Sequence, residues 1–166
     1  MKSNFNKEIN LFVDKINMNV KLKSERVIEL EESISHLEEC ELYIEKVSEN
    51  LYKILNEIFQ DEDEIIFCIN IYKESDKYYY LPLKLRRYLK KKDKINMISS
   101  LNENEIIEHY YINTRYNNVK IKKLISEIVK KDLGNRIEGL ETSFIINKRC
   151  SVAVVLYDDR YIFIEY

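Results

Sequence analysis

Glycine is nearly absent from this chain of 166 residues, which contains only Gly134 and Gly139. The P-loop, the dinucleotide-binding fingerprint and the Gly-x-Ser-x-Gly nucleophile turn all need glycines at fixed spacings, because their backbone must approach a phosphate closely or turn sharply. These two glycines match none of those patterns. The enzyme classes that depend on these motifs are therefore excluded.

Histidine and cysteine are also scarce. The two histidines, His36 and His109, lie in no zinc-binding spacing, and Cys40, Cys68 and Cys150 form no Cys-x-x-Cys pair. An odd number of cysteines without a secretory signal argues against a disulfide framework. We therefore expect reduced thiols, no metal site and no cofactor.

A catalytic triad could in principle combine Cys150 as the nucleophile, His109 as the base and one of Asp158 or Asp159 as the orienting carboxylate. Spacing along the chain does not bring these residues together, and no local sequence signature accompanies the cysteine. A small apolar residue beside a strand is the simpler interpretation of Cys150. We expect no catalytic residues and a protein that is not an enzyme.

Long apolar runs are absent too. No run reaches the length of a membrane span, and the first residues carry Lys7 and Glu8 where a signal peptide would be apolar. The sequence therefore predicts a cytoplasmic protein. Apolar residues make up 45% of the chain and charged residues 34%, as in globular proteins. A chain of this length buries about 70% of its unfolded surface, enough for one domain with its own core.

The period of the apolar residues predicts four helical segments. Helical spacing favours a short helix over residues 9–16 and a longer one over residues 39–59. Pro82 suits the first turn of a strongly basic helix over residues 83–94, and residues 119–133 show the same period as the second helix.

Runs of β-branched and aromatic residues predict strands. Residues 65–72 are nearly all of these types, which is typical of a central strand buried on both faces. Residues 25–30 fit either a strand or the start of a helix, and we favour a strand. The other predicted strands are 106–114, 144–146, 152–157 and 161–164, the last two joined as a hairpin.

These elements predict an α+β fold. We expect a single domain over residues 25–166, with an N-terminal helical segment in residues 1–24. Its mostly antiparallel sheet is predicted to have about five strands, two or three packing helices and a C-terminal β-hairpin.

Four short motifs occur in a distinctive order across residues 25–166. They are Tyr43-Ile44-Glu45 opening a helix that ends in Ile58-Phe59, the strand from Asp63 to Asn70, Phe144-Ile145-Ile146-Asn147, and Tyr157-Asp158-Asp159-Arg160. In this order they resemble the bacterial domain-of-unknown-function family 3885. The resemblance implies a small cytosolic α+β protein, of a kind sometimes encoded beside secreted toxins as an immunity factor, and it implies no catalytic residues.

The acidic run Asp61 to Glu64 could ligate a divalent cation. It lacks the glycine and the spaced oxygen ligands of a calcium loop. We interpret it as a charged entrance to the strand that follows.

An acidic surface is the first candidate binding site. The net charge of −2 is uneven, because residues 1–64 hold 16 acidic and 8 basic side chains. Such a field could occupy the cationic cleft of a nuclease or toxin, although a solvated helix face would look the same. Tyrosines suit protein interfaces as well. The candidate partner-binding residues are Glu31, Glu32, Glu38, Glu41, Glu45, Tyr78, Tyr79 and Tyr80.

A basic and aromatic stretch is the second candidate. Phosphate contacts combined with stacking rings are what single-stranded nucleic acid requires. The acidic pI of about 5.9 and the lack of a known nucleic-acid-binding motif argue against this function. The residues concerned are Arg86, Arg87, Tyr88, Lys90 and Lys91. Our hypothesis is a stoichiometric inhibitor or immunity protein that occludes a basic protein partner, with a nucleic-acid-binding accessory protein as the alternative.

Overall fold

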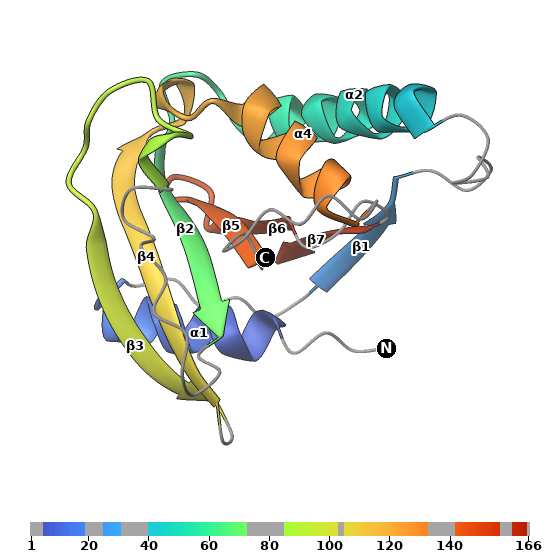
Figure 1. The fold of residues 1–166 in the computed structure, drawn as a ribbon. Coiled ribbons are helices and arrows are strands. Elements are labelled where there is room, and N and C mark those ends of the chain that lie inside the picture. Colours follow the sequence, from blue (N-terminus) through green and yellow to red (C-terminus); the bar gives the residue numbers. More distant parts are fainter. Residues whose placement is uncertain are drawn as a thin grey trace.

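The computed structural model describes residues 5–18, 25–30, 40–72, 85–102, 105–132, 142–156 and 161–165 (Figure 1). Seven strands form one sheet in the order β1-β7-β6-β5-β2-β4-β3, and every neighbouring pair is antiparallel. The strands are β1 (Glu25–Glu29), β2 (Glu64–Tyr72), β3 (Asn96–Asn102), β4 (Glu105–Arg115), β5 (Thr142–Asn147), β6 (Val152–Leu156) and β7 (Tyr161–Glu165).

Helices cover both faces of the sheet. Helix α1 (Phe5–Lys15) lies on one face, and α2 (Cys40–Ile58) and α4 (Ile121–Asp132) lie side by side on the other (Figure 1). A short 3-10 turn, η1 (Tyr116–Asn118), connects β4 to α4. None of the described helices is long and apolar enough to cross a membrane.

Alternation along β2 explains why two helical layers are needed. Phe67 packs into the core under α2 and α4, while Ile66 and Cys68 pack into the core under α1. Successive side chains of a strand point to opposite faces, so a strand with apolar residues on both faces must be covered twice. The strand is an interior one, with β4 on one side and β5 on the other.

The helices bury their apolar stripes against this sheet. Phe12 of α1 is fully buried, with its ring centroid 5.2 Å from that of Phe144. On the opposite face, Val47 and Leu51 of α2 share a core with Leu124 of α4. Burial of each large apolar side chain contributes about 1.5–3 kcal/mol, so these stripes fix the positions of the helices.

Most predicted elements are confirmed, and the α+β class with them. The sheet has seven strands because β3, which the sequence did not predict, pairs with β4. Its sequence Asn-Met-Ile-Ser-Ser-Leu-Asn lacks the β-branched and aromatic run of the other strands. Because β3 is an edge strand of the sheet, it needs fewer buried apolar residues than an interior strand does.

The prediction of a basic helix over residues 83–94 is wrong. Of its described residues, only Leu85 and Arg86 are helical, and a turn follows them. The backbone instead bonds to a distant segment: the amide of Lys90 donates to the carbonyl of Asn118, and that of Lys120 donates to the carbonyl of Tyr88. Residues 83 and 84 lie outside the described residues.

Candidate functional site

A groove runs between α2 and α4. It has a volume of about 870 Å³, and we call it the acidic groove. Its lining residues are Glu41, Ile44, Glu45, Ser48, Glu49, Tyr52, Lys53 and Asn56 from α2, and Lys122, Ile125, Ser126 and Lys130 from α4.

One wall of the acidic groove carries a row of carboxylates. Glu41, Glu45 and Glu49 are four residues apart, so they lie on one face of α2 and all three are exposed. Within the described residues, none of them forms an ion pair. The row therefore presents negative charge to solvent, and Lys53, Lys122 and Lys130 line the same groove.

The floor of the acidic groove is apolar. Ile44 and Tyr52 are half-buried and Ile125 is buried beside them. From the opposite wall, the Lys122 ammonium lies 4.9 Å from the centroid of the Tyr52 ring, a cation–π contact. The Ser48 hydroxyl is buried without a hydrogen-bond partner in the part of the chain that the structure describes. An apolar floor with a few polar groups is typical of a binding site.

The structure describes only two of the predicted partner-binding residues. Glu41 and Glu45 lie together in the acidic groove, as their spacing suggested. The others lie outside the described residues: Glu31, Glu32, Glu38, Tyr78, Tyr79 and Tyr80.

Two of the predicted nucleic-acid-binding residues make intramolecular contacts instead. The Arg87 guanidinium and the Tyr88 hydroxyl both donate to the same carboxylate oxygen of Glu127 on α4. Tyr88 is 2% exposed, and burial together with the Glu127 contact raises the pKa of its hydroxyl. The expectation that Tyr88 offers a stacking ring is wrong, because apolar packing draws the ring into the core.

Two of the other predicted basic residues border a second hollow. Lys90 and Lys91 line a space of about 650 Å³ together with Arg115, Lys148 and the carboxylates of Glu64 and Asp93. We call the four cations and their hollow the basic basin. Arg86 is exposed but does not line it. The four cations come from segments far apart in the sequence, so their proximity could not be predicted from spacing alone.

Polar contacts hold the loop beside the basic basin. One carboxylate oxygen of Asp93 accepts hydrogen bonds from Thr114 Oγ1 at 2.5 Å and from Asn118 Nδ2 at 2.7 Å. Asn118 Oδ1 in turn accepts from the Lys91 amide at 2.7 Å. These bonds fix the backbone that carries Lys91.

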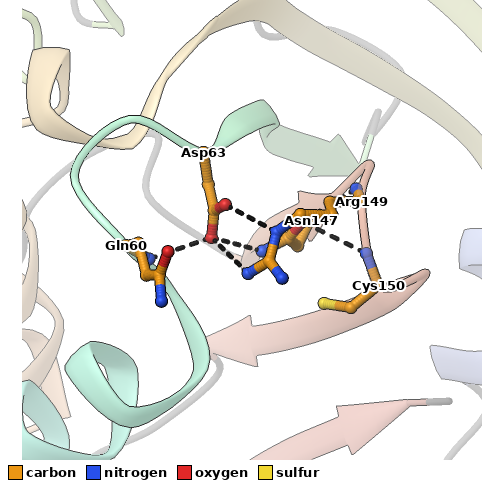
Figure 2. Close-up of polar contacts among 5 residues, drawn as sticks. All are labelled: Gln60, Asp63, Asn147, Arg149 and Cys150. Atoms are coloured by element: carbon orange, nitrogen blue, oxygen red, sulfur yellow. Dashed lines mark hydrogen bonds and ion pairs between the residues drawn. The ribbon is translucent and has the colours of Figure 1, made fainter.

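A buried carboxylate links two of the four family motifs (Figure 2). Asp63 Oδ2 accepts from the Gln60 amide at 2.9 Å and from Asn147 Nδ2 at 2.7 Å, and Oδ1 accepts from Arg149 Nε at 3.0 Å. The hydrogen bond from Arg149 lowers the pKa of Asp63, against an opposing effect of burial. Both carboxylate oxygens are occupied, so this network is structural.

The Asp63 network corrects the interpretation of residues 61–64 as a charged entrance to the strand that follows. Asp61, Glu62 and Glu64 are exposed, as a charged strand entrance requires, whereas Asp63 is 7% exposed. The sequence signal was the position of Asn147, which ends β5, while Asp63 directly precedes β2. Antiparallel pairing of β2 with β5 brings these ends together.

His109 does not form a triad with Cys150. Its ring is fully buried, with Nε2 2.6 Å from Ser100 Oγ and Nδ1 2.7 Å from Asn70 Oδ1. Burial and the charge of Lys15 lower the pKa of His109 to about 4, so it is neutral at pH 7. Cys150 lies in the exposed turn after β5, and residues 158 and 159 fall outside the described residues.

Metal ligands are not clustered either. Across the described residues, no group of three or more His, Cys, Asp or Glu side chains could hold a metal ion.

Comparison with known proteins relates this chain to a family. The model of a family described as a domain of unknown function, DUF3885, matches residues 9–163. No curated protein and no solved structure matches the chain.

Proposed function

This chain belongs to the DUF3885 family, and we propose that it is a non-enzymatic protein-binding module, acting as a stoichiometric inhibitor in the manner of an immunity protein. The acidic groove is the proposed binding surface. The observation that supports this is the exposed row of Glu41, Glu45 and Glu49 above an apolar floor.

The chemistry of the acidic groove defines the proposed partner. A groove between two helices suits an amphipathic segment whose apolar face covers the floor. Lysine or arginine side chains of that segment would pair with the carboxylate row, which favours fast association and selects against acidic competitors. Lys122 and Lys130 on the opposite wall would contact acidic or carbonyl groups and set the direction of the segment.

The walls of the acidic groove are held before any partner binds. Val47 and Leu51 of α2 and Leu124 and Ile128 of α4 are buried in one core below it. A preformed site loses little conformational entropy on binding, and this favours affinity.

The proposal is tested by comparing capture with two variants of the tagged, full-length chain. Wild type should retain one protein in near-stoichiometric amount from a nuclease-treated lysate of its host, after a wash at about 0.5 M salt that screens exposed charges. The variant E41K/E45K/E49K should lose that protein. The control E57K changes an exposed glutamate of α2 that does not line the groove, and should retain it. Equal retention by all three forms would contradict the proposed surface.

A nucleic-acid-binding accessory protein is the second candidate. The basic basin supports it, because Lys90 and Lys91 line one hollow with Arg115 and Lys148, of which Arg115 pairs with Glu62 and Lys148 with Glu64. Each phosphate contact made by such a cation weakens with salt. Fluorescence anisotropy of labelled single-stranded RNA should therefore show binding that falls steeply with salt and is lost in K90A/K91A/R115A. The control K46A alters an exposed lysine of α2 and should bind as wild type does.

A further inference from the structure

The two edges of the sheet differ in charge (Figure 1). Strand β1 forms one edge and carries Glu25, Arg26 and Glu29. Strand β3 forms the other edge, and its sequence Asn-Met-Ile-Ser-Ser-Leu-Asn contains no charged residue and no proline. Its register with β4 is continuous, without a bulge. Charges, prolines and bulges are the usual means by which proteins prevent pairing at an edge strand, and β3 has none of them in its own sequence.

Large apolar side chains are exposed beside the β3 edge. Met97 and Leu101 of β3 are 52% and 65% exposed, and Ile106 of β4, which pairs with Leu101, is 47% exposed. The three side chains lie on one face of the sheet, because residues two apart in a strand point the same way, as do directly paired residues. A group of exposed apolar side chains is typical of an interaction surface, whereas isolated ones are common on any protein.

The backbone of β3 also points outward at this edge. The Lys15 ammonium of α1 donates to the Ser99 carbonyl at 2.5 Å, which indicates that this carbonyl points away from β4. In an antiparallel strand, alternate residues direct their amides and carbonyls to the same side, so those of Met97 and Leu101 point outward as well. A carbonyl oxygen has two lone pairs, so Ser99 can accept a second hydrogen bond beside Lys15. Among the strands that the structure describes, none pairs with this side of β3.

The sequence of β3 reads nearly the same in both directions from Ser99. Met97 corresponds to Leu101 and Asn96 to Asn102, and only the two residues next to Ser99 differ in type. If two copies paired antiparallel about Ser99, Met97 of each copy would lie opposite Leu101 of the other. Opposed apolar side chains stabilise a strand pair. A two-fold interface requires a surface that is complementary to itself, and β3 has this property.

We propose that two copies of this chain associate through β3, which pairs antiparallel about Ser99 and joins the two sheets into one. Met97 and Leu101 of each copy cover those of the other. Seven residues from each copy make a small interface, below about 1,200 Å² in total, the size of weak and reversible complexes. The dissociation constant should therefore be on the order of 10 µM. This surface goes beyond the proposed inhibitor function, because no residue of β3 or β4 lines the acidic groove.

Lys15 limits the affinity of this dimer. Its ammonium contacts Ser99, so pairing about Ser99 brings the Lys15 side chains of the two copies close together. Like charges repel, and added salt screens the repulsion. The dimer should therefore become tighter as the salt concentration is raised, and several-fold tighter in K15Q.

The test is analytical ultracentrifugation of the full chain at concentrations from about 1 to about 500 µM, which bracket the expected dissociation constant. Wild type should change from monomer to dimer over this range. M97K/L101K should stay monomeric, with a dissociation constant at least about tenfold higher, because each lysine would face a lysine of the other copy. The control V27K makes the same kind of change at an exposed apolar residue of β1 and should dimerise as wild type does.

A charge exchange tests the antiparallel register. In M97K/L101E, the lysine of each copy would face the glutamate of the other, so dimerisation should return to within about tenfold of wild type. Parallel pairing would instead place like charges opposite each other in this variant. The altered side chains are exposed, so each variant should keep the thermal midpoint of the wild-type monomer. This measurement shows that a loss of dimerisation does not come from unfolding.

Four results would overturn the proposal. The first is a wild type that stays monomeric up to about 500 µM, well above the expected dissociation constant. The second is dimerisation that persists in M97K/L101K or is lost equally in V27K. The third is M97K/L101E that remains as monomeric as M97K/L101K. The fourth is loss of self-association in E41K/E45K/E49K, which would assign it to the acidic groove.

Discussion

Beneath α1 three buried polar side chains form one hydrogen-bonded network, whereas beneath α2 and α4 two buried hydroxyls lack partners within the described residues. Asn70, Ser100 and His109 form one closed network beneath α1. On the other side, the hydroxyls of Ser48 and Tyr116 lack partners within the described residues. Paired buried groups contribute to stability, whereas a buried hydroxyl without a partner costs stability. The α1 face therefore holds the better-satisfied network, and the proposed binding surface lies on the other face.

The largest effect should come from Phe12→Ala on the α1 face. The ring of Phe12 is fully buried and lies 5.2 Å from the ring of His109. Removing it leaves a cavity beside the network, and the free energy of unfolding should fall by about 3–5 kcal/mol. Urea denaturation measures the loss. The control Phe163→Ala, at a half-buried position on the same face, should cost less, and an equal cost would remove the special role of Phe12.

The second effect is a pH dependence that originates in His109. Its pKa is lowered from 6.5 to about 4 in the folded chain, so the unfolded chain takes up the proton first as the pH falls. Stability is complete above about pH 6.5 and is lost as the pH falls toward 4, by about 3 kcal/mol in all. Lys15 is the charged group that acts on the ring, and it adds to the loss by repelling the imidazolium.

Urea denaturation at about pH 7.5 and about pH 5 measures this dependence, with a loss of about 2 kcal/mol expected over the interval. The control His109→Gln keeps a polar side chain but does not titrate, so it should lose less stability between the two pH values. The carboxyl of Asp63 does not interfere, because its pKa is lowered from 3.8 and lies below this range. Parallel curves for both proteins would contradict the assignment to His109.

The third effect concerns Asp63, which joins β2 to the turn after β5. Replacing it by alanine leaves the Gln60 amide and the Asn147 side chain without their acceptor, and should cost about 1–3 kcal/mol. Arg149→Ala should cost less, because the Arg149 side chain is 61% exposed and the other two bonds to Asp63 remain. The surface control is Glu62→Ala, which removes the exposed ion pair between Glu62 and Arg115. This change should cost less than about 1 kcal/mol. Equal losses in all three variants would show that burial of Asp63 contributes nothing.

Local sequence patterns predicted the elements whose own residues determine them. The apolar run of β2 and the helical period of α2 are examples, because each reports burial directly. The strand β3 and the irregular segment 87–95 could not be predicted in this way. Their conformation depends on backbone bonds to β4 and η1, which join residues far apart in the chain.

The same distinction applies to the sites. The row of Glu41, Glu45 and Glu49 follows from helical spacing within α2, so the acidic wall was predictable. The opposite wall comes from α4, and the basic basin combines residues 90 and 91, β4 and the turn after β5. Such combinations follow from tertiary packing, which spacing along the chain does not specify.

The smallest effect on stability should come from E41K/E45K/E49K, and it is the most direct test of the comparison. These side chains are exposed and form no ion pair within the described residues, so the free energy of unfolding should change by less than about 0.5 kcal/mol. Association with the captured partner should nevertheless slow by about tenfold or more at low salt, and added salt should no longer slow it further. Stopped-flow mixing measures that rate, with E57K as the control. A rate that is unchanged would mean that the unpaired carboxylates are only a solvated surface, and binding could then no longer be assigned to this face through the acidic groove.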